Sequence, residues 1–443
     1  MTTPLPLPLR DALTEKLLES LEGPLLPSTP RRVFGTTALP GKVTAVVGMR
    51  RVGKTTLLHQ WRSAHLAGGV PRFQLPYLNF EDERLAGLDA GQLGFLVEEH
   101  ARRVPDLQGK VVWCFDEIQV VPGWERFVRR LLDSARHEVM VTGSSAALLS
   151  REIATALRGR GWEVPLYPFS FSEVLQHRGL AIPEEPSFLV GAARARIERA
   201  FLDYLAGGGF PEVQGLGIPE RRRMLQDYVD VAMLRDVMER HGVTNVTGLR
   251  WLVRHLLGNA GALFSVEKFY AALKSQGVAI SKDTLHQLLL HLEDCFLVRL
   301  VWMESTSERQ RMVNPRKAYP VDTGLIPVFD RSGKGNLGHA LETAVLIELE
   351  RRHCAVTYVR TNEGYEVDFL VRDAVGGMEL IQVCADASDP ATAQRELRAL
   401  QAAGAVHAGA RKRLLTLTLD GAPTEVPNDV VVQTAYEWML NGY

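Results

Sequence analysis

Short apolar runs alternate with longer amphipathic stretches in the first part of the chain. The runs at 43–47, 111–115 and 138–142 are rich in β-branched residues, which is typical of strands buried in a parallel sheet. Residues 56–67 have helical spacing, and a Gly-Gly pair then ends the stretch. Strands that alternate with helices predict an α/β core, which we place at 41–168.

The segments on either side of this core lack strand patterns. Residues 1–40 contain many prolines and one short amphipathic stretch at 11–21, so we expect an N-terminal arm. Helical spacing returns in three stretches, at 172–177, 193–205 and 219–240. We interpret residues 169–245 as a helical lid on the core.

Residues 246–330 show a different order of elements. Three helical stretches are predicted, and Ser265 and Ser281 are the expected N-caps of the second and third. A strand, a loop and a returning strand are predicted at 296–303, 304–311 and 312–321. Three helices followed by a strand–loop–strand hairpin is the order of a winged helix.

The last segment, residues 331–443, mixes helices with strands. The predicted helix, strand, strand, helix and strand lie at 338–352, 365–371, 379–384, 394–402 and 413–419. We therefore expect a further α/β domain here.

The composition is that of a globular protein. The 443 residues include 51 Lys+Arg and 52 Asp+Glu, and 46% are hydrophobic, which excludes a disordered or fibrous chain. The longest stretches without a charged residue have 12 residues, too few for a membrane helix, and the first residues do not have the pattern of a signal peptide. The four cysteines are far apart, which argues against zinc and disulfides. We expect a cytoplasmic protein with no membrane partner, on which any basic surface is local.

The sequence GMRRVGKT at 48–55 matches the phosphate-loop pattern G-x-x-x-x-G-K-[ST], between a predicted strand and a predicted helix. Backbone N–H groups and the positive end of the helix dipole favour phosphate here. We expect Lys54 to reach the terminal phosphates of ATP and Thr55 to bind Mg²⁺. The alternative is a chance glycine-rich turn. The predicted nucleotide-binding residues are Gly48, Arg51, Val52, Gly53, Lys54, Thr55 and Thr56.

Polar residues follow the next two predicted strands. Asp116 is expected to bind Mg²⁺ and Glu117 to activate water, although an acidic pair after a strand is also typical of a solvated turn. After the strand at 138–142 we choose Ser144 as the group that senses the γ-phosphate, with Thr142 next. The alternative for Ser144 is the N-cap of a following helix.

An arginine between glycines follows these strands. Arg160 is expected to meet the γ-phosphate of a neighbouring subunit, because a guanidinium there would stabilise the charge of the transition state. Arg158 is the second choice. A surface loop arginine is the alternative.

These motifs together resemble one family of proteins. The segments GMRRVGKTTLL, LNFEDERL (78–85), VVWCFDEIQ (111–119), VTGSSAALLS (141–150) and ALRGRG (156–161) are similar to those of the archaeal-type AAA+ ATPases, and so is YLAGGGFPEV (204–213) in the helical part. The resemblance extends over nearly the whole chain from about residue 31. It implies an ATP hydrolase that forms a homo-oligomer such as a hexameric ring.

The predicted hairpin of the winged helix is basic, with Arg299, Arg309, Arg311, Arg316 and Lys317 against only two acidic residues. The third helix has a single cation, which argues against reading of the DNA major groove. We therefore expect sequence-independent contacts of Arg309, Arg311, Arg316 and Lys317 with DNA phosphates, duplex or branched. A winged helix that only contacts protein is the alternative.

The order of elements in the last segment resembles the PD-(D/E)XK nuclease fold. The resemblance implies a metal site in which Glu342 is the helix acid, Asp368 the metal acid and Gln382 the first member of the E/Q-x-K pair. Cys384 stands where that pair has its lysine, and a neutral thiol cannot supply a positive charge. We expect a structural or DNA-gripping version that does not cleave.

Three hypotheses about function follow. The first is an ATP-driven motor that remodels DNA, the second a nucleotide-controlled switch that assembles with a protein partner, and the third an ATP-gated nuclease.

Overall fold

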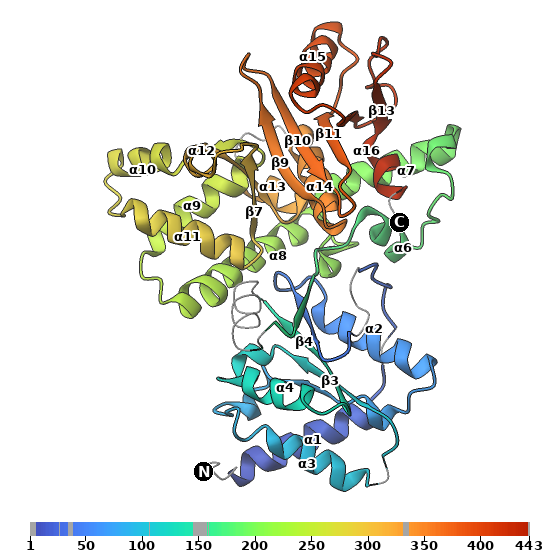
Figure 1. Ribbon diagram of the computed structural model, residues 1–443, viewed down its shortest axis with the longest axis vertical. Helices are drawn as coiled ribbons and strands as arrows, with labels where there is room; N and C mark the ends of the chain where they lie inside the picture. The colour runs from blue at the N-terminus through green and yellow to red at the C-terminus, as the bar shows by residue number, and fades with distance from the viewer. Residues whose placement is uncertain are drawn as a thin grey trace. The chain divides into compact units, whose positions relative to one another are not determined.

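The computed structural model of the chain describes residues 6–25, 27–33, 39–105, 107–144, 157, 159–330 and 336–441. The chain divides into two compact units, Met1–Leu166 and Tyr167–Tyr443 (Figure 1). None of the described helices is both long enough and apolar enough to cross a membrane.

The first unit is built on a parallel sheet of five strands in the order β2-β3-β4-β1-β5. Every residue of β1 and β3 is buried, as expected for central strands of a parallel sheet. The strands are β1 (Val43–Val47), β2 (Tyr77–Asn79), β3 (Val111–Asp116), β4 (His137–Gly143) and β5 (Gly161–Pro165). The strands predicted at 43–47, 111–115 and 138–142 are thus present, and the loops after β1, β3 and β4 leave the same edge of the sheet.

The described helices of this unit are α1 (Leu7–Glu22), α2 (Lys54–Ala67), α3 (Gly94–Arg103) and α4 (Trp124–Leu132), with the short 3-10 helices η1 (Arg72–Gln74), η2 (Glu83–Leu85) and η3 (Ile118–Val120). The stretch predicted at 11–21 lies within α1. Leu13 and Leu17 of this helix are fully buried, and α1 contacts α3 and β2. The N-terminal arm therefore forms part of the unit's core.

The second unit contains a mixed sheet of eight strands in the order β13-β12-β11-β10-β9-β7-β8-β6. The strands are β6 (Leu263–Phe264), β7 (Val298–Met303), β8 (Arg316–Pro320), β9 (Ala355–Arg360), β10 (Glu366–Arg372), β11 (Met378–Cys384), β12 (Arg411–Thr416) and β13 (Val430–Thr434). β8 pairs antiparallel with both β6 and β7, and β7 pairs parallel with β9. The predicted domain boundary between residues 330 and 331 therefore divides a unit whose sheet is continuous.

Two groups of helices accompany this sheet, and Figure 1 shows α9, α10 and α11 together, apart from α14, α15 and α16. The α-helices are α6 (Phe171–His177), α7 (Gly191–Gly207), α8 (Ile218–Val231), α9 (Val246–Gly258), α10 (Val266–Ser275), α11 (Lys282–Asp294), α12 (Glu308–Val313), α13 (Ile326–Phe329), α14 (Leu337–Arg351), α15 (Pro390–Val406) and α16 (Ala435–Leu440). The others are the π-helix η6 (Ala232–Glu239) and the 3-10 helices η4 (Pro186–Phe188), η5 (Pro211–Val213) and η7 (Thr323–Leu325). Leu341 and Val345 of α14 belong to one apolar core, and Leu397 and Leu400 of α15 belong to another.

The local predictions for 246–321 are confirmed except in the hairpin. Ser265 and Ser281 cap α10 and α11 by accepting hydrogen bonds from backbone N–H groups. The segment expected to be a loop and the start of a strand instead forms the short helix α12, which Ser307 caps. As a result, the returning strand β8 begins only at Arg316.

Candidate functional site

The phosphate loop joins the end of β1 to the start of α2. At Gly48 an added Cβ would lie 2.2 Å from the carbonyl oxygen of Leu166, so no side chain fits there. Gly53 has a φ of 96°, which favours glycine, and it ends the loop where α2 begins. Backbone packing thus requires both glycines of the motif, and the N–H groups of the first turn of α2 remain available to an anion.

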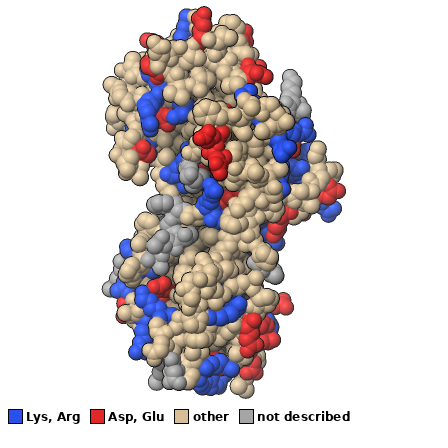
Figure 2. Space-filling view, turned by 90° about the vertical axis from the view of Figure 1, so that its right-hand side faces the viewer, with Lys and Arg blue, Asp and Glu red and all other residues tan. Residues whose placement is uncertain are grey.

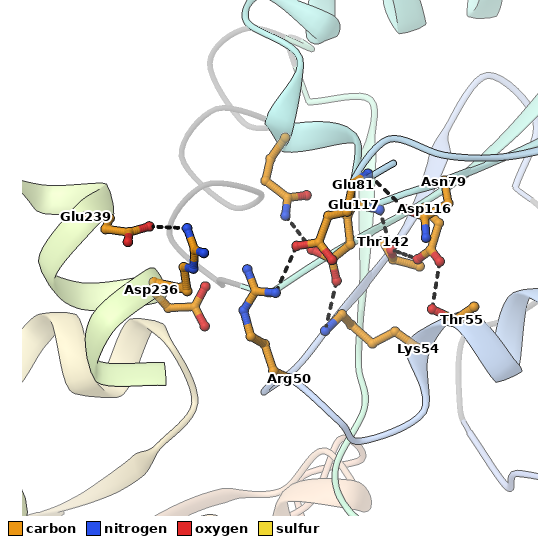
Figure 3. Close-up of polar contacts among 12 residues, drawn as sticks. Arg50, Lys54, Thr55, Asn79, Glu81, Asp116, Glu117, Thr142, Asp236 and Glu239 are labelled. Carbon is orange, nitrogen blue, oxygen red and sulfur yellow. Dashed lines mark hydrogen bonds and ion pairs between the residues drawn. The ribbon is translucent and has the colours of Figure 1, made fainter. Parts of the chain in front are cut away.

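Lys54 lies almost fully buried at the start of α2 (Figure 3). Its Nζ donates to the carbonyl oxygens of Gly48 and Met49 at 3.2 and 3.3 Å. The same ammonium group lies 3.2 Å from Oε1 of Glu117. The lysine therefore contacts both the loop and the predicted water-activating residue.

Asp116 ends β3 and is fully buried. Its carboxylate accepts hydrogen bonds from the hydroxyls of Thr55 at 2.6 Å, Tyr77 at 2.9 Å and Thr142 at 2.5 Å. Burial raises the pKa of Asp116, and these hydroxyls only partly oppose that effect. Of the two candidates for sensing the γ-phosphate, Thr142 contacts Asp116. Ser144 is buried two residues further along the chain, and its role as a sensor stays a prediction.

Glu117 follows with a strained backbone, because its φ of 53° lies in a region that residues with a side chain rarely adopt. Its N–H donates to Thr142 Oγ1 at 2.9 Å, and its Oε2 accepts from Gln119 at 2.5 Å. Burial opposes ionisation of the carboxyl group, but Lys54, Gln119 and Arg50 outweigh it, so the pKa of Glu117 is lowered. Glu117 is therefore a carboxylate near neutral pH and can accept a proton.

The residues at this edge fit a magnesium ion. Thr55 and Asp116 present a hydroxyl and a carboxylate 2.6 Å apart, and oxygen ligands are those that Mg²⁺ prefers. No group of three or more His, Cys, Asp or Glu side chains suited to a metal occurs in the described part of the chain. A site that needs only one carboxylate and one hydroxyl, with phosphate and water as the other ligands, is consistent with that finding.

The N-terminal arm contacts the phosphate loop through Arg31, which the sequence did not single out. Its Nη1 donates to the carbonyl oxygen of Val52 at 2.7 Å, and its backbone N–H donates to Gln60 of α2 at 3.0 Å. Gln60 in turn donates to the carbonyl oxygen of Thr29 at 2.6 Å. The arm therefore braces both the loop and the helix that follows it.

Arg160 lies at the amino ends of the strands, whereas the phosphate loop lies at their carboxyl ends. It comes just before β5, whose first residue Gly161 pairs with Val43 at the start of β1. Its Nη1 donates to Asp133 at 2.5 Å. A strand of this length spans roughly 15 Å, so Arg160 does not serve the phosphate site of its own subunit. Arg158 lies outside the described residues.

The second unit contains a buried lysine among acidic residues, which we call the lysine–acid cluster. Nζ of Lys317 lies 3.1 Å from Glu342, 2.9 Å from Glu366 and 2.8 Å from Asp368. Lys317 is only 3% exposed, so the prediction that it contacts DNA is wrong. Burial opposes its charge, but the three carboxylates outweigh burial and raise the pKa of Lys317. Tyr319 donates to Glu342 at 2.5 Å and completes the cluster.

Gln382 and Cys384 do not join this cluster. The Gln382 amide donates to Glu396 of α15 at 2.7 Å, and its oxygen accepts from the backbone N–H of Asp368. Cys384 donates to the carbonyl oxygen of Asp386. The cation that contacts Glu342 and Asp368 is Lys317 on β8.

Three of the four residues predicted to contact DNA are accessible on the hairpin, and the contact itself stays a prediction. Arg309 is exposed on α12, and Arg311 and Arg316 are partly exposed. The guanidinium carbon of Arg316 lies 3.6 Å from the ring centroid of Trp302, and that of Arg311 lies 5.7 Å from it. Arg299, by contrast, is ion-paired with Glu350 at 2.8 Å. The face of the molecule drawn in Figure 2 intermixes basic and acidic residues.

Sequence reasoning missed Tyr319 and Tyr77, although each had a signal in the sequence. Lys317 and Tyr319 are two positions apart on β8, so the alternation of a strand puts them on one face, and Tyr319 is buried. Tyr77 starts a short strand beside β3, where an aromatic hydroxyl can reach Asp116. Arg31 had no comparable signal, because its partner is a backbone carbonyl.

Comparisons with known proteins match most of the chain. Residues 40–175 match the family model described as an AAA domain, and residues 198–333 match a domain of unknown function, DUF8612. The uncharacterized protein MJ1544 of Methanocaldococcus jannaschii is 31% identical over 394 residues, which cover 88% of this chain and 85% of that protein. An uncharacterized protein of Haemophilus influenzae is 31% identical over 333 residues, 75% of this chain and 80% of that protein. Among solved structures, the Walker-type ATPase PABY2304 of Pyrococcus abyssi has a TM-score of 0.37 and 17% identity, covering 72% of this chain and 95% of that one.

Proposed function

The chain belongs to the family of the uncharacterized protein MJ1544 and has an AAA domain of an archaeal-type P-loop ATPase, and from this premise we propose that it is a Mg²⁺-dependent ATP hydrolase that forms a homo-oligomer and remodels DNA. The observation that carries the proposal is the cluster at the edge of the first sheet. It brings Lys54 within hydrogen-bonding distance of Glu117, and Thr55 within hydrogen-bonding distance of Asp116.

We derive the hydrolytic step from the contacts of Lys54. Its ammonium group neutralises Glu117 at 3.2 Å while no phosphate competes for it. Phosphate oxygens carry more charge than one carboxylate, so ATP attracts the lysine away from Glu117. The released carboxylate loses the cation that lowered its pKa, so it becomes a better acceptor for a proton of the attacking water. Mg²⁺, when bound by Thr55 and Asp116, offsets charge on the phosphates.

The proposed oligomer accounts for the position of Arg160. This residue lies at the amino ends of the strands, away from the phosphate loop of its own subunit. It could therefore contact ATP only if the phosphate site of a second subunit lay beside it. Its partner Asp133 is 60% exposed, so the ion pair is a surface contact that is easily exchanged. Closure of the subunit interface around ATP would transfer Arg160 to the γ-phosphate.

The proposed DNA contact rests on the segment from α9 to β8. The order α9, β6, α10, α11, β7, α12, β8, with β8 paired to both other strands, resembles that of a winged helix in which the short helix α12 occupies the hairpin connection. Arg309, Arg311 and Arg316 lie on its hairpin and suit phosphate oxygens of any sequence. The solved structures with low similarity add nothing to this argument.

The ATPase rate with and without linear, forked and four-way duplex DNA, at two salt concentrations, tests the proposal. Stimulation by one DNA form that is lost at high salt is expected. ATP hydrolysis without stimulation by any DNA would reject the DNA part and favour a nucleotide-controlled switch with a protein partner. No hydrolysis under any condition would reject the ATPase part.

For the lysine–acid cluster we propose a structural role rather than DNA cleavage. Lys317 already neutralises part of its charge, and Gln382, the expected metal ligand, is bonded to Glu396. Purified protein with Mg²⁺ or Mn²⁺ should therefore leave plasmid and linear DNA intact. Cleavage that disappears in Asp368→Ala would instead support the ATP-gated nuclease.

A further inference from the structure

Two consecutive apolar side chains are exposed at the end of α12. Met312 is 70% and Val313 76% exposed, and α12 has no buried residue. Single exposed apolar residues are common on protein surfaces. Among the residues that the structure describes, however, no other two large exposed apolar side chains are consecutive in sequence. Such a pair on a short projecting element marks a contact surface.

The charge around this pair identifies the kind of partner. Arg309 and Arg311 come before it on α12, and Arg316 follows it at the start of β8. Glu308 is the only acidic residue in the segment 305–316. An apolar tip between three arginines and one carboxylate matches a polyanion with apolar surface between its charges, which is the chemistry of stacked base pairs between phosphates.

The tip stands on a rigid base. The guanidinium of Arg316 stacks on Trp302, with its carbon 3.6 Å from the ring centroid. The hydroxyl of Tyr358 on β9 donates to the carbonyl oxygen of Pro315 at 2.6 Å. The next residue, Lys317, is held by the three carboxylates of the lysine–acid cluster. These contacts fix the base of the hairpin, so the tip can keep its position when it presses against a bound molecule.

From these observations we infer that Met312 and Val313 form a wedge that enters the minor groove of duplex DNA and partly separates two stacked base pairs. The inference rests on the proposed DNA partner and specifies how the hairpin acts on it. The arginines hold the phosphates on both sides, and the apolar side chains replace base–base contacts at one step. Wedges of this kind kink the duplex toward the major groove.

The inference is tested by energy transfer between dyes at the two ends of a short duplex, with the full-length protein. Wild-type protein should raise the transfer efficiency on binding, because the ends approach one another. Met312→Ser with Val313→Ser should lose most of this increase and weaken binding about 3–10-fold, with the salt dependence of the affinity unchanged. Arg309→Gln with Arg311→Gln should instead lower the slope of log affinity against log salt by roughly two.

Val375→Ser is the matched control, because Val375 is 92% exposed and lies in the turn between β10 and β11, outside the hairpin. It should bind and bend DNA as wild type does. Unchanged melting temperatures would show that all three variants are folded. A small minor-groove ligand should compete with wild-type protein.

Each other outcome overturns the inference in a distinguishable way. Binding without bending, or bending that survives the double serine substitution, would reject the wedge and leave the DNA partner in place. Loss of self-association in the double serine variant, with DNA bending retained, would make the tip a protein contact. No DNA binding by the wild type would reject both the wedge and the proposed DNA partner.

Discussion

Each of the two units buries a lysine among acidic side chains, yet the two lysines have different surroundings. Lys54 lies at the start of a helix, with two loop carbonyls and a single carboxylate at about 3 Å. Lys317 lies within a strand and contacts three carboxylates at comparable distances. Both are almost fully buried, at 5% and 3% exposure. Burial alone therefore does not distinguish a reactive lysine from a structural one.

The difference lies in what can replace each contact. Among the described residues Lys54 has one ion pair, and the adjoining loop offers N–H groups that attract a phosphate, so an anion can take the place of Glu117. Three acidic side chains on α14 and β10 contact Lys317, so a single anion could not take the place of all of them. We conclude that the first lysine can exchange partners, whereas the second stabilises the fold.

Replacing the exchangeable lysine should have the largest effect. Lys54→Ala is expected to abolish nucleotide binding and lower ATP hydrolysis at least about 10³-fold, because it removes the ammonium group that is expected to bind the terminal phosphates. Nucleotide binding by equilibrium fluorescence and phosphate release would measure both effects. Lys42→Ala is the control, since Lys42 only donates to the carbonyl oxygen of Gly159 on the surface. Tight ATP binding by Lys54→Ala would contradict the assignment.

Replacing Glu117, the charged partner of Lys54, should separate ATP binding from ATP hydrolysis. Glu117→Gln keeps the shape and loses the proton acceptor, so ATP should bind normally while hydrolysis falls about 10²–10⁴-fold. Single-turnover kinetics with labelled ATP would distinguish the two steps. A wild-type rate in this variant would assign water activation to another residue.

The structural lysine should affect stability instead. Lys317→Met leaves Glu342, Glu366 and Asp368 without the buried cation that contacts all three and should lower the unfolding free energy by about 3–5 kcal/mol. Urea unfolding followed by circular dichroism would measure the change. Lys282→Met is the matched control, because the ion pair of Lys282 with Glu267 is exposed and should contribute less than about 1 kcal/mol. Equal effects of the two substitutions would break the comparison.

The pH dependence of stability should be smaller but specific. Burial, and then the charge of Asp368, raise the pKa of Glu342 from 4.5 to about 8. The folded protein then holds a proton that the unfolded chain releases, so stability falls as pH rises from about 4.5 to about 8. Glu342→Gln should remove about 1–3 kcal/mol of this dependence. Unfolding free energies near both ends of that range, in wild type and variant, would measure it; identical profiles would refute the proposed cause.

The parts predicted from sequence are those determined by neighbours in the chain. The phosphate loop, the acidic pair at Asp116 and the caps Ser265 and Ser281 depend on spacing within a few residues. Lys317 could not be placed, because its partners on α14 and β10 are 25 to 51 residues away. The hydrogen bond of Gln382 could not be predicted for the same reason, since its partner Glu396 lies on α15. Helix α12 was missed because six residues give too short a period to detect.

The position of Arg160 has a genetic consequence. If each ATP site takes its arginine from the next subunit, a site is the joint product of two polypeptides, and defects at its two halves are separable. A subunit with Lys54→Ala can still donate Arg160, and a subunit with Arg160→Ala can still hold ATP. Two inactive variants expressed together should then restore ATPase activity in mixed oligomers. An excess of either variant should lower the activity of oligomers that contain wild-type subunits, in proportion to the amount of variant.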